Sequence, residues 1–157
     1  MNRKRSPPSA LYTTITNYEY YDTLRTDAHD DGTTNWTINK AARPGDTVLL
    51  YVCAPVSAIV AVARVSSIPE LCDDPQSAWF GKHFADMHDL RLLTLQIGRH
   101  NLLEDLPSWR YWKQPRNSIR VPDEFVPTML YAIDTWQTSN EPHLRLPADF
   151  QRHASVD

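Results

Sequence analysis

The chain has 157 residues, of which 41% are hydrophobic and 22% are charged, and this is ordinary for a single globular domain with its own core. Its formal net charge of −3 argues against a protein that coats nucleic acid through bulk positive charge, although a local basic surface is still compatible with it. No apolar run approaches the roughly 20 residues of a membrane-spanning helix, and no apolar stretch follows the basic start, so we expect a cytoplasmic protein without a membrane partner.

The first half of the chain predicts an arm and three strands. Residues 1–9 are basic and predict a flexible arm, whereas a single domain is expected over 10–140 and a loosely held tail over 141–157. β-Branched and aromatic residues predict a strand within 10–21, and the acidic, turn-prone residues 22–35 predict a surface loop or a short helix followed by a loop. The runs 47–54 and 58–67 are too apolar to be half exposed, so they predict strands that line a closed core.

The second half predicts a strand, two helices and a second, shorter strand. Residues 69–89 are a long excursion with little periodicity, and a strand is expected over 90–98. Leucines at helical spacing predict a helix over 99–106 that ends before Pro107, and a short strand is expected over 117–122. A terminal helix is expected over 123–137, with Leu130, Ile133 and Trp136 facing inward. The elements together predict an α+β fold, a small mixed β-barrel of about five to six strands flanked by short helices.

Candidate catalytic and metal-binding groups are few. The chain contains no GxSxG elbow, no Gly-rich phosphate loop and no HExxH motif. His83, Asp86 and His88 are the best candidates for metal ligands, but on a helix His88 would point away from the other two. A second acidic group is more typical of a solvated loop, and it consists of Asp27, His29, Asp30 and Asp31. We therefore expect neither an enzyme nor a bound metal or other cofactor.

The two cysteines do not suggest a disulfide. Cys53 lies in an apolar run and Cys72 lies in a polar, loop-like segment, and they do not form a CxxC pair. In the cytoplasm such residues are expected to be reduced thiols.

One segment combines aromatic and basic residues without any acid. Trp109, Tyr111 and Trp112 interleave with four cations, namely Arg110, Lys113, Arg116 and Arg120. Aromatic faces stack on bases at about 1–3 kcal/mol per base, and guanidinium groups hold phosphates. The composition is equally consistent with aromatic residues in the core and cations on a solvated rim, and it does not choose between the two.

Trp36 and Trp79 raise the same question. A tryptophan at the end of a strand either fills the core or forms one wall of a pocket for a flat ligand such as a flipped base. A pocket of that kind needs aromatic walls and a few polar partners, and Asn35, Asn39 and Ser57 stand near the ends of the apolar strands.

The segment from Asn35 to Phe125 resembles the EVE domain, a relative of the YTH and PUA domains. The resemblance is carried by Trp36, by Arg43-Pro44-Gly45-Asp46, by Tyr51 and Ser57, and by the strand "IVAVARV", followed by "IGRHNLL" and "KQPRNSIRVP" in the family's order. Two departures concern the pocket. Ala61 replaces the usual glycine of the second strand, and "TINK" follows Trp36 where one branch has Gly-Val-Arg-Asn.

The resemblance implies a PUA-like barrel and a non-catalytic reader of modified bases in nucleic acid, in DNA rather than in RNA. It implies that Trp36 and Trp79 are the walls of a base pocket with Tyr51 nearby, that Asn35, Asn39 and Ser57 contact the base edge, and that Arg110, Lys113, Arg116 and Arg120 hold the phosphate backbone. The base would be a cytosine of the 5-methylcytosine type or a methyladenine, and a nuclease of a modification-dependent restriction system would be a fused or separate partner. An RNA-binding module, or a module for a small ligand or a protein partner on the same barrel, is the alternative.

Overall fold

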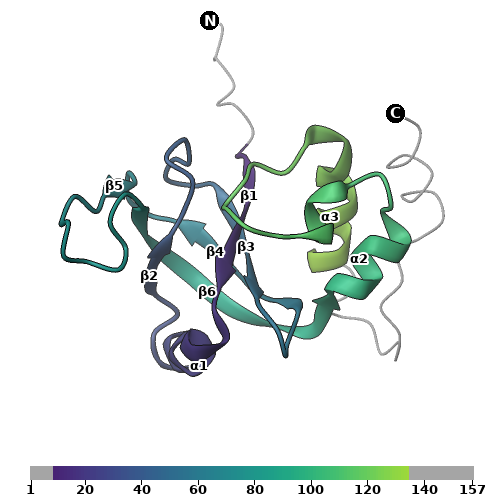
Figure 1. The fold of residues 1–157 in the computed structure, drawn as a ribbon. Helices are drawn as coiled ribbons and strands as arrows, with labels where there is room; N and C mark the ends of the chain where they lie inside the picture. The colour runs from purple at the N-terminus through teal and green to yellow at the C-terminus, as the bar shows by residue number, and fades with distance from the viewer. Residues whose placement is uncertain (1–8, 135–157) are drawn as a thin grey trace, which may run out of the picture.

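The computed structural model describes residues 9–134 (Figure 1). The predicted arm, apart from Ser9, the predicted tail and Trp136 lie outside the described residues. The strands are β1 (Leu11–Thr16), β2 (Thr34–Thr37), β3 (Thr47–Val52), β4 (Ala58–Val65), β5 (Glu70–Leu71) and β6 (His83–Gly98). The α-helices are α1 (Tyr21–Asp30), α2 (Arg99–Asp105) and α3 (Val126–Asp134), and the short 3₁₀ helices are η1 (Tyr18–Tyr20), η2 (Arg110–Lys113) and η3 (Asp123–Phe125).

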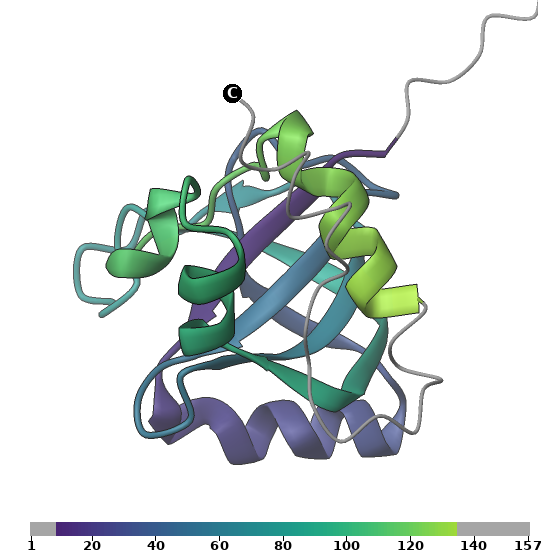
Figure 2. The ribbon, with the colours of Figure 1, turned by 90° about the vertical axis from the view of Figure 1, so that its right-hand side faces the viewer.

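The strands form one mixed sheet in the order β1-β3-β4-β6-β2, with β5 paired to β6. β1 and β3 are parallel, and the other pairs are antiparallel. The sheet curls into a half-barrel, with α1 running across one end and α2 and α3 covering one face (Figures 1 and 2). The predicted α+β class and the mixed sheet with short flanking helices are confirmed.

Both faces of β3 and β4 are buried, which explains why their sequences are apolar without alternation. Leu49 and Tyr51 belong to the cluster that packs under α2 and α3, whereas Val48, Leu50 and Val52 face the interior of the half-barrel. The first cluster also contains Trp109 and Trp112, whose side chains are 3% and 0% exposed. These two tryptophans are therefore core residues, and stacking on bases is excluded for them in this fold.

The edges of the sheet, β1 and β2, approach each other along a line that we call the seam. Thr14 donates a hydrogen bond of 2.6 Å from its hydroxyl to the Thr37 carbonyl, so one side chain bridges the two edges. Further along β1, the segment 117–121 takes the place of a strand. The Thr13 N–H donates to the Ile119 carbonyl at 2.9 Å, and Arg120 forms a single β-bridge with Tyr12. The short strand expected over 117–122 is thus reduced to one bridge.

Three further expectations were wrong. The excursion 69–89 ends in the first part of β6, where buried Ala85 and Met87 alternate with more exposed Asp86 and His88, so its period of two is that of a strand. Thr34 and Asn35 were expected in a loop, because residues 22–35 are acidic and turn-prone, but they form the first half of β2. Leu130 was expected to face inward with Ile133, but its side chain is 40% exposed, whereas Ile133 is buried as expected.

Candidate ligand-binding pocket

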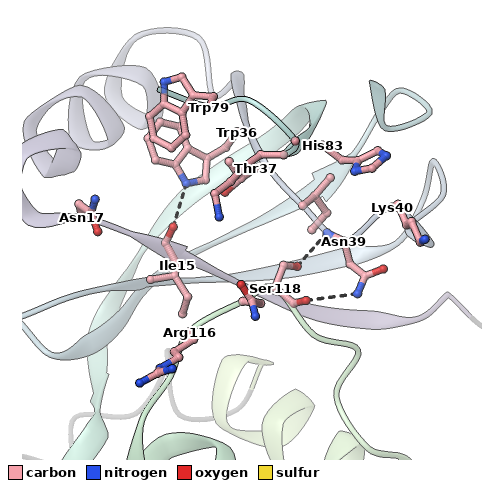
Figure 3. Close-up of a pocket in the computed structure, with 14 residues that line it drawn as sticks. Ile15, Asn17, Trp36, Thr37, Asn39, Lys40, Trp79, His83, Arg116 and Ser118 are labelled. Atoms are coloured by element: carbon pink, nitrogen blue, oxygen red, sulfur yellow. Dashed lines mark hydrogen bonds between the residues drawn. The ribbon is translucent and has the colours of Figure 1, made fainter. Parts of the chain in front are cut away.

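A pocket of about 480 Å³ opens at the seam, within the range of about 300–1,000 Å³ that is typical of sites for small ligands (Figure 3). Four stretches of the chain contribute to its lining, and they are 15–17 from β1 and its end, 36–40 from β2 and its end, 79–83 from the β5–β6 hairpin, and 116–118. The curled sheet brings these stretches together, although they are far apart in the sequence.

Trp36 lies on the face of β2 that is turned toward the pocket. Its indole N–H donates a hydrogen bond of 3.2 Å to the Ile15 carbonyl on β1, so the ring is fixed at the seam and its polar group is satisfied. Asn35, one residue earlier, points to the opposite face because side chains alternate along a strand. There its side-chain amide donates to the Asp86 carboxylate at 2.8 Å.

Trp36 and Trp79 form an aromatic corner. Their ring centroids are 5.6 Å apart and their planes meet at 67°, so the rings touch edge to face and leave no parallel slot between them. Tyr20 packs against both rings, at 5.3 Å from Trp36 and 5.6 Å from Trp79, and Phe84 contacts Trp79 at 5.6 Å. A flat ligand in the pocket can stack on one indole face while the other ring forms the end wall.

Asn39 and Ser118 connect two walls of the pocket. The Asn39 N–H donates to the Ser118 hydroxyl oxygen at 3.0 Å, and the Asn39 side-chain amide donates to the Ser118 carbonyl at 3.2 Å. The side-chain oxygen of Asn39 accepts the N–H of Ala41 at 2.8 Å. The predicted contact between Asn39 and a base edge would therefore compete with bonds that hold the wall in place.

Other polar side chains of the lining are free to meet a ligand. Within the part of the chain that the structure describes, Asn17, Asn117 and His83 have no side-chain hydrogen bond. Neither asparagine stands out in the sequence as a candidate site residue. In the sequence, Pro115 followed by Asn117-Ser118 indicates a turn. This turn signal was the feature that could have marked the segment as a pocket wall and not only as a source of cations.

The charges of the lining are all positive. Among the residues that the structure describes, Lys40, Lys82 and Arg116 line the pocket, and no carboxylate does. In the described range 9–134 none of the three forms an ion pair, whereas Arg120 lies 3.9 Å from the Asp123 carboxylate. Of the four cations expected to hold phosphates, the structure therefore brings only Arg116 to the pocket. Exposed Arg110 and Lys113 are on η2, outside the lining.

Tyr51 and Ser57 do not line the pocket. Tyr51 is 2% exposed and packs against Trp112 with ring centroids 5.4 Å apart. Burial raises the pKa of the Tyr51 phenol, and a hydrogen bond with the Ser57 side chain opposes that rise. Ser57 occupies the tight turn between β3 and β4 with φ 49°, next to a cis Ala54–Pro55 bond. Both residues were expected at the base pocket but lie outside the lining of this one, as does Asn35.

The candidate metal ligands are dispersed. His83 lines the pocket, Asp86 accepts from Asn35, and His88 lies 3.5 Å from the Asp89 carboxylate. Over residues 9–134 no group of three or more His, Cys, Asp or Glu side chains is arranged to hold a metal ion. The thiols of Cys53 and Cys72 are free.

The acidic group around α1 has structural partners. Asp27 accepts a hydrogen bond from the Thr34 hydroxyl at 2.8 Å, and this links α1 to β2. Asp31 accepts from the hydroxyl and N–H of Thr33, and the hydroxyl bond is the main cause that lowers the pKa of this carboxyl. Among the described helices, none is both long and apolar enough to cross a membrane.

The chain matches no model of a known protein family and no curated protein at a significant level. Solved structures do resemble it. A hypothetical protein from Leishmania major matches with a TM-score of 0.65 and 16% identity, over 85% of this chain and 99% of that one. The ASCH protein from Zymomonas mobilis matches with a TM-score of 0.53 and 11% identity, over 77% of this chain and 94% of that one.

A weaker match is the YTH domain of Pho92, solved in complex with m6A, with a TM-score of 0.49 and 13% identity over 88% of this chain and 92% of that one. At that score the match supports no inference. At the identities of the other two matches, similarity shows the fold alone. The chain has the PUA-like fold that it shares with the ASCH protein.

Proposed function

We propose that this protein is a non-catalytic reader of a modified base in nucleic acid. The observation that supports this most is the aromatic corner of Trp36 and Trp79, which opens onto a pocket whose charged side chains are all cationic. An aromatic face suits a flat base, and unpaired cations beside it suit the phosphates of the same strand.

The base would enter the pocket flipped out of its strand and stack on an indole face. Stacking of one base on an aromatic ring contributes about 1–3 kcal/mol and hardly depends on the base. Selectivity then has to come from the base edge, where Asn17, Asn117 and His83 offer free polar groups, and from space for the extra methyl group. A methyl group in a fitting pocket is worth roughly 10- to 200-fold in discrimination.

The backbone of the nucleic acid would run past Lys40, Lys82 and Arg116. Each phosphate neutralised by such a cation lowers the slope of log affinity against log salt by about 0.9 in duplex DNA. Three contacts give a salt dependence that is measurable and still modest, which agrees with a chain whose net charge is negative.

The choice of ligand follows from the resemblance of Trp36, Gly45-Asp46 and "IVAVARV" to the EVE domain. We accordingly propose DNA that carries a cytosine of the 5-methylcytosine type or a methyladenine, read in the cytoplasm by a specificity module of a modification-dependent restriction system with a nuclease as its partner.

The test is binding by fluorescence anisotropy to short labelled oligonucleotides. Duplexes with 5-methylcytosine, 5-hydroxymethylcytosine or 6-methyladenine are compared with the unmodified duplex and with RNA of matching sequence. The wild type should bind one modified duplex about ten-fold or more tightly than the unmodified one. Trp36→Ala should weaken that binding by about 5- to 100-fold, because one stacking surface is lost.

Trp36→Phe is the conservative variant, since it keeps a flat aromatic face, although a smaller one, and loses the N–H that bonds to Ile15. It should keep most of the preference for the modified base. Equal weak binding to every oligonucleotide by the wild type would contradict the proposal and favour a small ligand or a protein partner for the same pocket. Tighter binding to RNA would move the proposal from DNA to RNA.

A further inference from the structure

The β5–β6 hairpin carries a short loop, 73–80, whose shape is fixed by its own hydrogen bonds. The Cys72 N–H donates to the Lys82 carbonyl at 2.8 Å, and the Gly81 N–H donates to the Cys72 carbonyl at 2.9 Å, which closes the hairpin below the loop. Within the loop, the Trp79 N–H donates to the Ser77 hydroxyl oxygen at 3.0 Å. Gly81 has φ +83°, a conformation that favours glycine, and it lets the chain turn from the loop into β6.

Phe80 lies between two residues of the pocket lining, and its own side chain is exposed to solvent. Its neighbours in the chain, Trp79 and Gly81, both line the pocket, but Phe80 does not. Its side chain is 58% exposed, which makes it the most exposed aromatic side chain in the part of the chain that the structure describes. A single exposed apolar residue needs no explanation by itself. Here, however, the ring is held on a hydrogen-bonded loop beside the place where a flipped base would enter.

We propose that Phe80 inserts into duplex DNA in the space that the flipped base leaves, so that the protein prefers the modified base in a duplex over the same base in a single strand. This inference rests on the proposed function. Flipping a base from a duplex costs a few kcal/mol of pairing and stacking. A phenyl ring that occupies the vacated space can stack on the flanking bases and recover part of that cost. In a single strand there is no base-pair stack to fill, and the wedge would contribute little.

The chemistry of the loop favours the base stack as the surface that Phe80 contacts. The same loop carries two carboxylates, Asp73 and Asp74, and these repel phosphates. Asp74 is partly used within the loop, where it accepts the N–H of Gln76 at 2.9 Å. In the proposed complex the phosphates are bound by the pocket cations Lys40, Lys82 and Arg116, so the loop is left to make an apolar contact.

An abasic duplex tests the wedge without knowledge of the modified base. A short DNA duplex with one tetrahydrofuran abasic site has the gap already formed, so the wild type should bind it more tightly than the intact unmodified duplex. Phe80→Ala should lower affinity for the abasic duplex by roughly 5- to 100-fold, the loss expected for one stacked ring. Affinity for the corresponding single strand should change by less than two-fold or so.

Leu71→Ala is the matched control, because Leu71 is 53% exposed on the same hairpin and lies outside the pocket at the seam. It should bind the abasic duplex like the wild type, and thermal unfolding should show that both variants fold. Unchanged affinity of Phe80→Ala for the abasic duplex, or an equal loss on duplex and single strand, would overturn the wedge. Failure of the proposed function would give a different result. In that case Trp36→Ala would bind modified duplexes as the wild type does, independently of the result for Phe80→Ala.

Discussion

The backbone N–H of Asn39 and the hydroxyl oxygen of Ser118 lie 3.0 Å apart, and the two residues are joined by a second bond of 3.2 Å from the Asn39 amide to the Ser118 carbonyl. The Ser118 hydroxyl also donates to the Thr13 carbonyl. A single serine thus ties the end of β2 to β1 at the wall of the pocket. Ser118 is therefore expected to stabilise the pocket wall, and this role does not require contact with a ligand.

Replacing Ser118 by alanine should destabilise the protein by about 1–3 kcal/mol, because it leaves a part-buried N–H and a carbonyl without their partner. Urea unfolding measures this loss. Ser66 is an exposed serine whose hydrogen bond to the Asp86 carbonyl comes from its backbone N–H, so Ser66→Ala should stay within about 0.5 kcal/mol of the wild type. Equal stability of the two variants would show that the Asn39–Ser118 link does not hold the wall.

Arg116 and Arg120 should differ in their effect on binding. Arg116 lines the pocket and has no ion pair with any residue of 9–134, whereas Arg120 is next to Asp123. Arg116→Gln should weaken binding to all DNA sequences alike and reduce the steepness of the salt dependence by about one phosphate contact. Arg120→Gln should leave the slope unchanged. Affinities measured at several salt concentrations separate the two, and identical slopes would remove Arg116 from the proposed backbone contact.

Trp112 should matter for stability and not for recognition. The ring is fully buried and contacts Trp109 at 5.3 Å, so Trp112→Ala should cost about 3–5 kcal/mol in the free energy of unfolding. Trp112→Phe should cost less, since it keeps one aromatic ring and removes a buried indole N–H that has no hydrogen-bond partner among the described residues. Denaturant unfolding gives both values. A Trp112→Phe variant that is stable but no longer binds nucleic acid would contradict this role.

Tyr111 should make stability depend on pH at alkaline values. Burial raises the pKa of its phenol from 10.0 to about 12, and its hydroxyl donates to the Asn117 carbonyl at 2.8 Å. Between pH 10 and 12 the unfolded state loses this proton while the folded state keeps it, so stability should fall as the pH rises through that window.

Tyr111→Phe removes the proton, and its stability should therefore fall less steeply over the same window. Tyr12 and Tyr51 also have raised pKa values, but they are present in both proteins and their effect cancels in the comparison. Urea unfolding at several pH values provides the measurement. Parallel curves for the two proteins would show that Tyr111 titrates equally in the folded and unfolded states.

The sequence predicted the strands β3 and β4, whose burial is uniform, and missed β2 and the first part of β6. β3 and β4 are apolar on both faces, so a continuous apolar run was sufficient to identify them. β2 has four residues, none of them buried, and it is a strand only because it pairs with β6. Such pairing depends on residues about 50 positions away, and local pattern contains no information about it.

The candidate site shows the same division. Trp36 and Trp79 were selected together through the family resemblance, and they do meet, at 5.6 Å. Lys40 and Lys82 were not selected, because two exposed lysines in separate loops have no common pattern until the sheet curls. The sequence also could not separate Trp109 from Trp36. Both stand near basic residues, and only the packing of α2 and α3 buries Trp109.

Because side chains alternate along β2, the number of residues that lead into this strand decides which side chain faces the pocket. Trp36 faces the pocket and Asn35 faces away only because the strand is anchored in one register, with Asn35 opposite Asp86 and Trp36 opposite Ala85. A shift by one residue would exchange an indole for a carboxamide at the wall. An insertion or deletion between Gly32 and Trp36 should therefore disturb the pocket wall more than most single substitutions there.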